Sequence, residues 1–196
     1  RTVYRALTGY TGPGDPLTDV ERLALVALCR FDTLPKGQFF VRAGEPAPRL
    51  GFLLDGLMRM YHVRTDGEEV SLDFVEEFGV IGSYETILLG QPSGHYVQAI
   101  TDCRFISLAY DALLRAYEQH PRLERLGREV MSQYLAQTLR RLSDYMRHTP
   151  EERYQRLQTE RPALLRRVPQ HLLASYVGVT PVSLSRIRRR LAEQRT

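Results

Sequence analysis

At 196 residues, the chain is long enough for one large domain or two modest ones, each able to bury a core. Hydrophobic residues make up 43% and charged residues 26%, and no apolar run approaches the roughly 20 residues of a membrane-spanning helix. The sequence shows no signal-peptide pattern, so the default expectation is a cytoplasmic location. Its two cysteines, Cys29 and Cys103, are too few for a disulfide scaffold and are expected to be small buried hydrophobes.

The net charge of +4 is unevenly distributed. From Glu151 onward there are 10 arginines and 4 glutamates, a net charge of +6, whereas residues 1–150 carry 17 basic and 19 acidic residues, a net charge of −2. This asymmetry indicates an anionic partner for the C-terminal part, and DNA fits a compact helical unit better than a membrane does. Genome composition can also explain the preference for arginine, because Lys36 is the only lysine.

The first predicted element is a helix over Asp19–Arg30, introduced by the capping-box pair Thr18 and Glu21. After Pro35 the pattern changes to short apolar runs separated by glycine and proline. These runs predict strands around Phe39–Val41, Phe52–Leu54, Met58–Arg64, Glu69–Val75, Tyr96–Thr101 and Arg104–Leu108. The segment Thr65-Asp66-Gly67-Glu68 is typical of a hairpin turn. Short strands at close spacing predict an antiparallel, jelly-roll-like β-roll within an α+β fold.

Helical periodicity returns at Asp111 and breaks at His120-Pro121. A much longer helix is expected from Pro121 to about His148, roughly 40 Å at 1.5 Å per residue. Apolar positions recur every seven residues on more than one face, as in Leu123 and Val130 or Leu135 and Leu142. One stripe can cover the roll and another can pair with the same helix of a second copy, which favours a homodimer. The alternative is a long helix that packs only on its own domain.

Thr149, Pro150 and Glu152 form a second capping box, which predicts a hinge between two helices. The expected domains are therefore a β-roll with an N-terminal helix (1–110), connecting and dimerisation helices (111–148) and a C-terminal unit (149–196). We expect that unit to be all-helical and to lack a β-wing, with Pro162–Leu165 as one short helical turn.

The segment Val168–Leu191 contains two short helical patterns separated by Gly178, which can adopt the positive φ that ends a helix abruptly. Thr180 can cap the second helix and Pro181 can occupy its first turn. The apolar face expected in the first helix consists of Leu172, Leu173, Tyr176 and Val177, and in the second of Val182, Leu184, Ile187 and Leu191. Ser183, Arg186, Arg188, Arg189 and Arg190 are left facing outward. This layout is typical of a DNA-reading helix-turn-helix, and the alternative is an ordinary helical hairpin with a solvated basic face.

The predicted order of elements is roll, long helix, Thr-Pro hinge and helix-turn-helix. The motif in the last element runs from Pro169-Gln170 through Ala174-Ser175-Tyr176-Val177-Gly178 to Leu184-Ser185-Arg186-Ile187-Arg188. This order and this motif together resemble the Crp/Fnr superfamily of bacterial transcription regulators. The resemblance covers essentially the whole chain. It implies a cyclic-nucleotide-binding-like β-roll, a dimerisation helix and recognition of near-palindromic double-stranded DNA by a homodimer, with RNA polymerase as a further candidate partner. No convergent catalytic set is visible, so an enzyme is not expected.

Ligand-binding members of that superfamily carry a phosphate cassette that begins Gly-Glu and has an arginine eleven residues after the glycine. Here the cassette begins at Gly82, but Ser83 replaces the glutamate and Ser93 replaces the arginine. A buried cyclic phosphate needs a bidentate cation and a ribose hydroxyl needs a carboxylate, so cyclic AMP or cyclic GMP is not expected to bind in the family's manner. The candidate effector pocket that remains consists of Gly82, Ser83, Tyr84, Glu85, Ser93, His95 and Thr138. A different small ligand stays open, as does an effector-sensing roll whose C-terminal part contacts protein instead of DNA.

The resemblance also implies roles in the second helix of the motif. Arg186 stands where the family reads a base, so a guanine contact is expected. Val182 is a candidate for a thymine methyl, and Ser183 for a base edge or a phosphate. The full candidate DNA-binding set is Thr180, Pro181, Val182, Ser183, Ser185, Arg186, Arg188, Arg189 and Arg190, of which the last three are assigned to the DNA backbone. No metal or cofactor is expected, because Cys29 stands alone in the first hundred residues and the five histidines are scattered.

Overall fold

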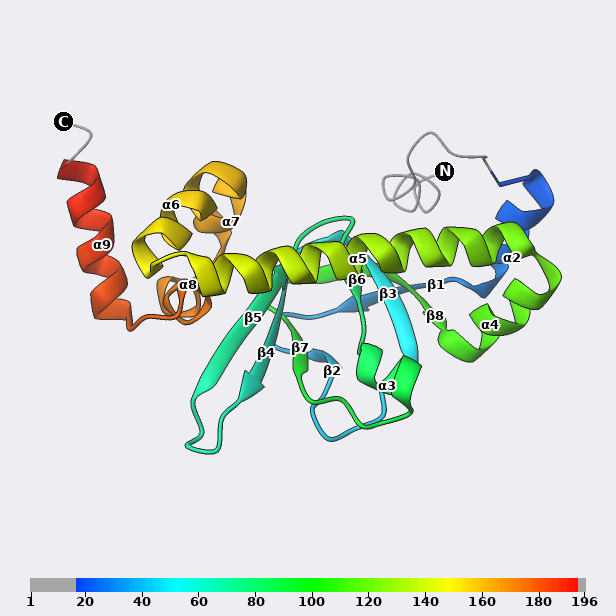
Figure 1. The fold of residues 1–196 in the computed structure, drawn as a ribbon. Coiled ribbons are helices and arrows are strands. Elements are labelled where there is room, and N and C mark those ends of the chain that lie inside the picture. The colour runs from blue at the N-terminus through cyan, green and yellow to red at the C-terminus, as the bar shows by residue number, and fades with distance from the viewer. Residues whose placement is uncertain (1–16, 194–196) are drawn as a thin grey trace.

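The computed structural model describes residues 17–193 (Figure 1). Two antiparallel four-stranded sheets have the orders β1-β8-β3-β6 and β2-β7-β4-β5. The strands are β1 (Arg30–Leu34), β2 (Phe39–Val41), β3 (Arg49–Asp55), β4 (Met58–Val63), β5 (Glu69–Val75), β6 (Val80–Ile81), β7 (Tyr96–Ala99) and β8 (Cys103–Ala109). We call residues 30–109 the roll. Its core contains Val41, Leu53, Met58, Ile81, Val97 and Phe105, contributed by both sheets. The predicted antiparallel roll is confirmed.

The predicted hairpin joins β4 and β5, and the Arg64 N–H donates to the Glu68 carbonyl at 2.9 Å across the turn. Gly67 adopts φ 87°, which a residue with a side chain rarely does. The first helix, α2 (Asp19–Leu28), ends two residues earlier than predicted, because Cys29 is already extended. The prediction is therefore wrong at Arg30, which begins β1 and pairs with Ser107 of β8.

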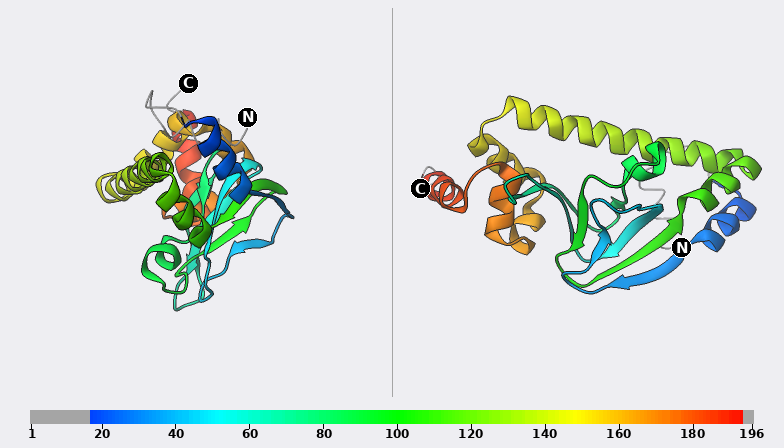
Figure 2. Two further views of the ribbon diagram at one scale, coloured as in Figure 1. Left: turned by 90° about the vertical axis from the view of Figure 1, so that its right-hand side faces the viewer. Right: turned by 90° about the horizontal axis from the view of Figure 1, so that it is seen from below.

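Three further helices lie on the roll: α3 (Tyr84–Leu89), α4 (Tyr110–Gln119) and α5 (Pro121–Arg147). The N-terminal part of α5 shares a buried cluster with α2, α4 and β8, through Leu25, Leu113, Leu123, Ile106 and Leu108. Figure 2 shows α5 running along the roll as a separate layer and continuing beyond it. The long helix is confirmed within one residue of its expected end. Within residues 17–193, no helix combines the length and the apolar character that crossing a membrane requires.

The structure describes residues 149–193 of the C-terminal unit. This part consists of Thr149, which caps the first helix, and of α6 (Pro150–Glu160), α7 (Pro162–Arg167), α8 (Gln170–Val177) and α9 (Pro181–Glu193). Its first helix has the predicted capping box, in which the Glu152 N–H donates to Thr149 Oγ1 at 3.3 Å. All four elements are helical, as predicted, and α7 extends two residues past the expected turn. Their common core is built from Tyr154, Leu157, Leu164, Leu173, Leu184 and Ile187.

The C-terminal unit also packs on β5 of the roll. Leu57 and Phe74 of the roll belong to the same buried cluster as the core of the unit. The Ser71 N–H donates to Ser175 Oγ at 3.0 Å, and Ser175 Oγ donates to the Glu69 carbonyl at 3.0 Å. The hinge at Thr149-Pro150 therefore interrupts the helices, but it does not divide the hydrophobic core.

Candidate DNA-binding face and candidate effector site

The turn between α8 and α9 has the geometry that the sequence predicted. Gly178 has φ 81°, and the Val179 N–H donates to the Ala174 carbonyl at 2.9 Å. The second helix is capped by Thr180, whose Oγ1 accepts the Ser183 N–H at 3.2 Å. The two helices of the motif are therefore held at a fixed angle by backbone geometry and not by side-chain packing alone.

Arg153 of α6 joins this motif to the end of the long helix, and sequence reasoning missed it. Its Nε donates to the Val177 carbonyl at 2.9 Å, and its Nη1 donates to the carbonyls of Tyr145 and His148 at 2.9 and 2.7 Å. The guanidinium also lies 4.3 Å from the centre of the Tyr145 ring. No motif signals this role, because the three carbonyls come together only in the folded chain.

The buried face of α9 consists of Leu184, Ile187 and Leu191, as predicted. The prediction that Val182 joins them is wrong, since its side chain is 62% exposed. At about 100° per residue, Val182 lies nearly half a turn away from the other three. It therefore shares the outward face of the helix with residues at four- and seven-residue spacing, Arg186 and Arg189.

The candidate DNA-binding residues lie on the solvent side of the C-terminal unit. All are exposed except Ser183, which is half-buried. Figure 1 shows α9 at the end of the molecule opposite to α2 and α4, with no other element outside it. Arg190 pairs with Glu151 of α6, and Arg189 Nε lies 3.7 Å from Glu193 Oε1. Arg186 makes no ion pair with any residue between 17 and 193, so its guanidinium is available to a ligand.

In the cassette, the two serines that replace charged residues are buried and satisfied by their neighbours. Ser83 caps α3, a helix that sequence reasoning missed although Ser83 and Gly90 have the spacing of its two caps. Ser93 Oγ donates to the His95 carbonyl at 2.9 Å and accepts the His95 N–H at 3.3 Å. Neither serine places a charge in the cassette.

Glu85 of α3 points back over the cassette. Its Oε2 accepts the Gly94 N–H at 2.6 Å and lies 3.6 Å from His95 Nδ1. The other ring nitrogen of His95 lies 3.4 Å from the Gly82 carbonyl oxygen. The structure thus brings Gly82, Glu85, Ser93 and His95 of the predicted pocket together. Ser83 bonds Thr86 of α3 instead, and Tyr84 packs against α5.

Thr138 is not brought to this cluster. It is exposed, and its hydroxyl donates to the Tyr134 carbonyl at 3.0 Å, one turn earlier on α5. The residue of α5 that contacts α3 is Tyr134, whose ring centre lies 4.4 Å from that of Tyr84. Because Tyr134 already fills this contact, Thr138 takes no part in the cassette of the single chain.

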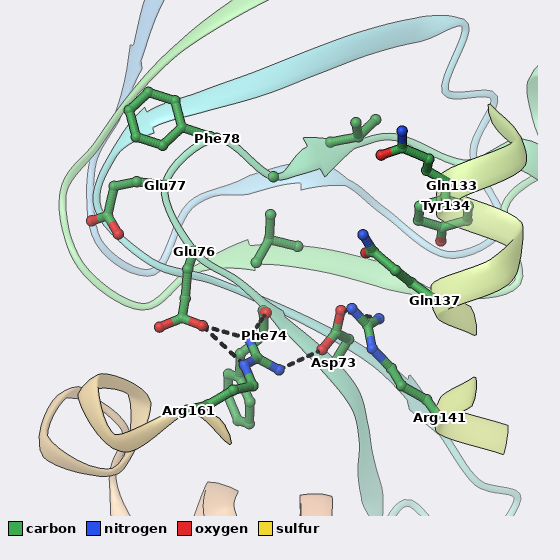
Figure 3. A pocket seen from close by; sticks show the side chains of 13 residues that line it. Asp73, Phe74, Glu76, Glu77, Phe78, Gln133, Tyr134, Gln137, Arg141 and Arg161 are labelled. Carbon is green, nitrogen blue, oxygen red and sulfur yellow. Dashed lines mark hydrogen bonds and ion pairs between the residues drawn. The ribbon is translucent and has the colours of Figure 1, made fainter. Parts of the chain in front are cut away.

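A cleft of about 530 Å³, which the sequence analysis did not foresee, opens where the roll, α5 and the C-terminal unit meet (Figure 3). Its walls come from β5 and the loop to β6, from α5 and from the α6–α7 junction, and comprise residues 73–80, Gln133, Tyr134, Gln137, Arg141 and Arg161. Burial, together with the charge of Asp73, raises the pKa of Tyr134, so its hydroxyl stays protonated at neutral pH. Asp73 lies between Arg141 and Arg161 and pairs with both.

Metal-ligating clusters do not occur among residues 17–193, where no three histidine, cysteine or acidic side chains are grouped to hold an ion. The two thiols are unpaired. Burial raises the pKa of Cys29 to about 11, and burial also raises the pKa of the Cys103 thiol. Both are therefore protonated at neutral pH. Cys103 is buried as predicted, whereas the prediction is wrong for Cys29, which is only half-buried.

Comparison with known proteins agrees with this architecture. Residues 31–120 match the family described as the cyclic nucleotide-binding domain. The global nitrogen regulator of Synechocystis sp. is 28% identical over 109 residues, which are 55% of this chain and 48% of that protein. The match with such curated relatives therefore spans about half of their length.

Two solved structures extend the likeness to the C-terminal unit. The c-di-GMP responsive global regulator CLP of Xanthomonas campestris has a TM-score of 0.71 at 18% identity, covering 90% of this chain and 93% of its own. A Crp/Fnr-family protein of Eubacterium rectale has a TM-score of 0.71 at 12% identity, covering 95% and 88%. Residues 31–120 are thus similar to the cyclic nucleotide-binding domain family, and the chain as a whole shares its fold with these two solved structures.

Proposed function

We propose that the protein is a sequence-specific DNA-binding transcription regulator of the Crp/Fnr type, acting as a homodimer on a near-palindromic operator. The outward face of α9 carries the proposal: Val182, Arg186 and Arg189 line up on it, opposite the buried Leu184 and Ile187. In a two-fold dimer, two such helices enter successive major grooves about 34 Å apart. A cytoplasmic location and a contact with RNA polymerase accompany this proposal as expectations.

The C-terminal half of α5 supports the homodimer. Leu135, Leu139, Leu142 and Met146 recur at spacings of four, three and four residues, and they are 55%, 55%, 56% and 77% exposed. A helix that packed only on its own domain would leave this apolar stripe in water. Stripes with this spacing are typical of paired helices, which bury them against each other.

The cassette supports independence from cyclic AMP. A cyclic phosphate would meet the carboxylate of Glu85 and no arginine at position 93. We expect titration calorimetry with cyclic AMP to detect no binding, because like charges repel and no fixed cation offsets them. Micromolar binding of cyclic AMP would contradict this part of the proposal.

Arg186 is assigned to base reading, because its exposed guanidinium is available and guanine presents two acceptors in the major groove. Arg186→Ala should reduce discrimination between the operator and random DNA by about 1–3 kcal/mol. Arg189→Ala, on the same face and of the same size, should weaken binding to both DNAs alike if it contacts the backbone. Equilibrium titrations with both DNAs measure this, and equal losses for Arg186→Ala would refute its reading role.

Selection of bound sequences from random DNA tests the function as a whole. We expect a palindrome to be recovered, which would establish DNA reading and dimer symmetry together. We also expect the mobility shift to weaken steeply as salt rises, because phosphate contacts release counterions. No shift at low salt would favour the other candidate function, an effector-sensing roll whose C-terminal unit contacts protein.

A further inference from the structure

The cassette holds an anion of its own, the carboxylate of Glu85. Its Oε2 receives the Gly94 N–H at the short distance of 2.6 Å and lies 3.6 Å from His95 Nδ1. A β-carbon at position 94 would lie 3.1 Å from Glu85 Oε1, so the missing side chain of Gly94 leaves room for the carboxylate. A backbone N–H and an imidazole beside it are donors that suit an oxyanion.

We propose that Glu85 acts as a built-in anion: its carboxylate takes the position at Gly94 and His95 that the anionic group of a ligand would occupy, and thereby excludes such ligands. This goes beyond the function proposed above, in which Glu85 only repels a cyclic phosphate, because it gives the carboxylate a binding position of its own. Glu85 is then the residue that determines the ligand specificity of the cassette. A small carboxylate supplied from solution is the chemistry that should replace its side chain when that side chain is removed.

Next to Glu85, α3 also contacts the long helix. Tyr84, the residue before Glu85, packs its ring against Tyr134 of α5 at 4.4 Å between centres. Tyr134 in turn lines the cleft in which Asp73 pairs with Arg141 and Arg161 (Figure 3). The residue next to Glu85 therefore contacts α5 beside the cleft that adjoins the C-terminal unit.

The alternative is that Glu85 forms only an exposed ion pair with His95. Such a pair would contribute little to stability and would leave no vacant binding site when the glutamate is removed. The two cases are separated by chemical rescue of Glu85→Ala in the full chain, with acetate as the probe and sodium chloride at matched ionic strength as the reference. The first readout is the amide resonance of Gly94 in a ¹⁵N–¹H NMR spectrum. We expect the substitution to move this resonance, and millimolar acetate to return it toward its wild-type position in a saturable manner.

The second readout is thermal unfolding. Glu85→Ala should lower Tm by about 2–4 °C, and acetate should restore part of the loss, because a ligand that binds only the folded state stabilises it. The control is Glu118→Ala on α4, which makes the same change at an exposed glutamate whose side chain has no hydrogen bond or ion pair with any residue between 17 and 193. Its Tm should change by no more than about 1 °C and should not respond to acetate.

If Glu85→Ala does not fold, Glu85→Gln keeps the shape and removes the charge, and its Gly94 resonance should still move from the wild-type position. The proposal is overturned if the Gly94 resonance is unchanged by both substitutions, or if acetate moves it equally in wild type and Glu85→Ala. Neither readout involves DNA. Failure here is therefore distinguishable from failure of the proposed DNA-binding function.

Discussion

Arg161 of the C-terminal unit donates hydrogen bonds to three residues of the roll. Its Nε donates to Glu76 at 2.9 Å, its Nη1 to Asp73 at 3.1 Å and its Nη2 to the Phe74 carbonyl at 2.5 Å. Burial opposes its charge, but Asp73, Tyr176 and Glu76 outweigh that effect and raise its pKa. All three side-chain nitrogens of Arg161 thus donate hydrogen bonds within the protein.

Removing this guanidinium should cost more than removing an exposed one, because it leaves the half-buried Glu76 without its partner and the buried Asp73 with Arg141 alone. We expect Arg161→Ala to lower the free energy of unfolding by about 2–4 kcal/mol in urea titrations. Arg166→Ala, five residues on and exposed, should change it by less than about 0.5 kcal/mol. Similar losses in the two variants would contradict the role given to Arg161.

At the scale of elements, α5 is approached closely by α4 at a glycine in its interior. Tyr117 of α4 lies directly over Gly127, where an added β-carbon would overlap the phenol. Burial raises the pKa of Tyr117 to about 12, so this phenol stays neutral. Glycine weakens a helix by about 1 kcal/mol relative to alanine, and here that cost permits the close approach of the two helices.

Gly127→Ala should therefore destabilise the protein in spite of the better helix propensity of alanine. We expect a net loss of about 1–3 kcal/mol in the free energy of unfolding, as for other overpacked sites. Tyr117→Phe removes the overlapping hydroxyl, so the double variant should regain part of the loss. If the double variant is no more stable than Gly127→Ala, measured by urea unfolding, the clash does not explain the glycine.

The exposed stripe of α5 makes its own prediction. Leu139→Glu places a charge at the centre of the stripe and should convert the dimer to a monomer, because burying an unpaired carboxylate is costly. Arg140→Glu introduces the same group off the stripe and should leave the dimer intact. Sedimentation equilibrium distinguishes the two, and a monomeric wild type would refute the dimer outright.

At the scale of the whole molecule, the roll and the C-terminal unit are joined by charged groups as well as by core. Arg167 of α7 donates to both carboxylate oxygens of Glu77, at 2.7 and 2.8 Å, and to the Gly56 carbonyl at 2.6 Å. The hydrogen bonds from Arg167 lower the pKa of Glu77 below its ordinary value of 4.5. This junction lies beside the cleft, which Glu77 lines.

The junction should make stability depend on pH in the acid range. The folded-state pKa of Glu77 is below its unfolded value, so its contribution is complete above about pH 4.5 and is lost as pH falls through the folded-state value. The gap in unfolding free energy between wild type and Glu77→Gln should therefore be largest at neutral pH and shrink toward about pH 3. Urea titrations at both pH values measure it, and a gap that does not change with pH would contradict this assignment.

Local patterns in the sequence determined much of this protein. The capping boxes at Thr18 and Thr149, the turn at Gly67, the long helix and the helix-turn-helix around Gly178 all follow from neighbours within a few residues. Capping, turn formation and periodicity act over that range, so they can be inferred without knowing the fold. The replacement of the cassette glutamate by Ser83 and of its arginine by Ser93 could also be read from the sequence, because the cassette is a continuous segment.

Contacts between distant segments were decided by the tertiary structure alone. The arginines from residue 151 onward were counted together as one basic excess. In the structure, however, Arg153, Arg161 and Arg167 donate to carbonyls and carboxylates of other elements. The cleft, the contact of Tyr84 with Tyr134 and the inward turn of Glu85 arise in the same way. A charged side chain takes whichever partner the fold brings within bonding distance, and spacing along the chain does not encode that partner.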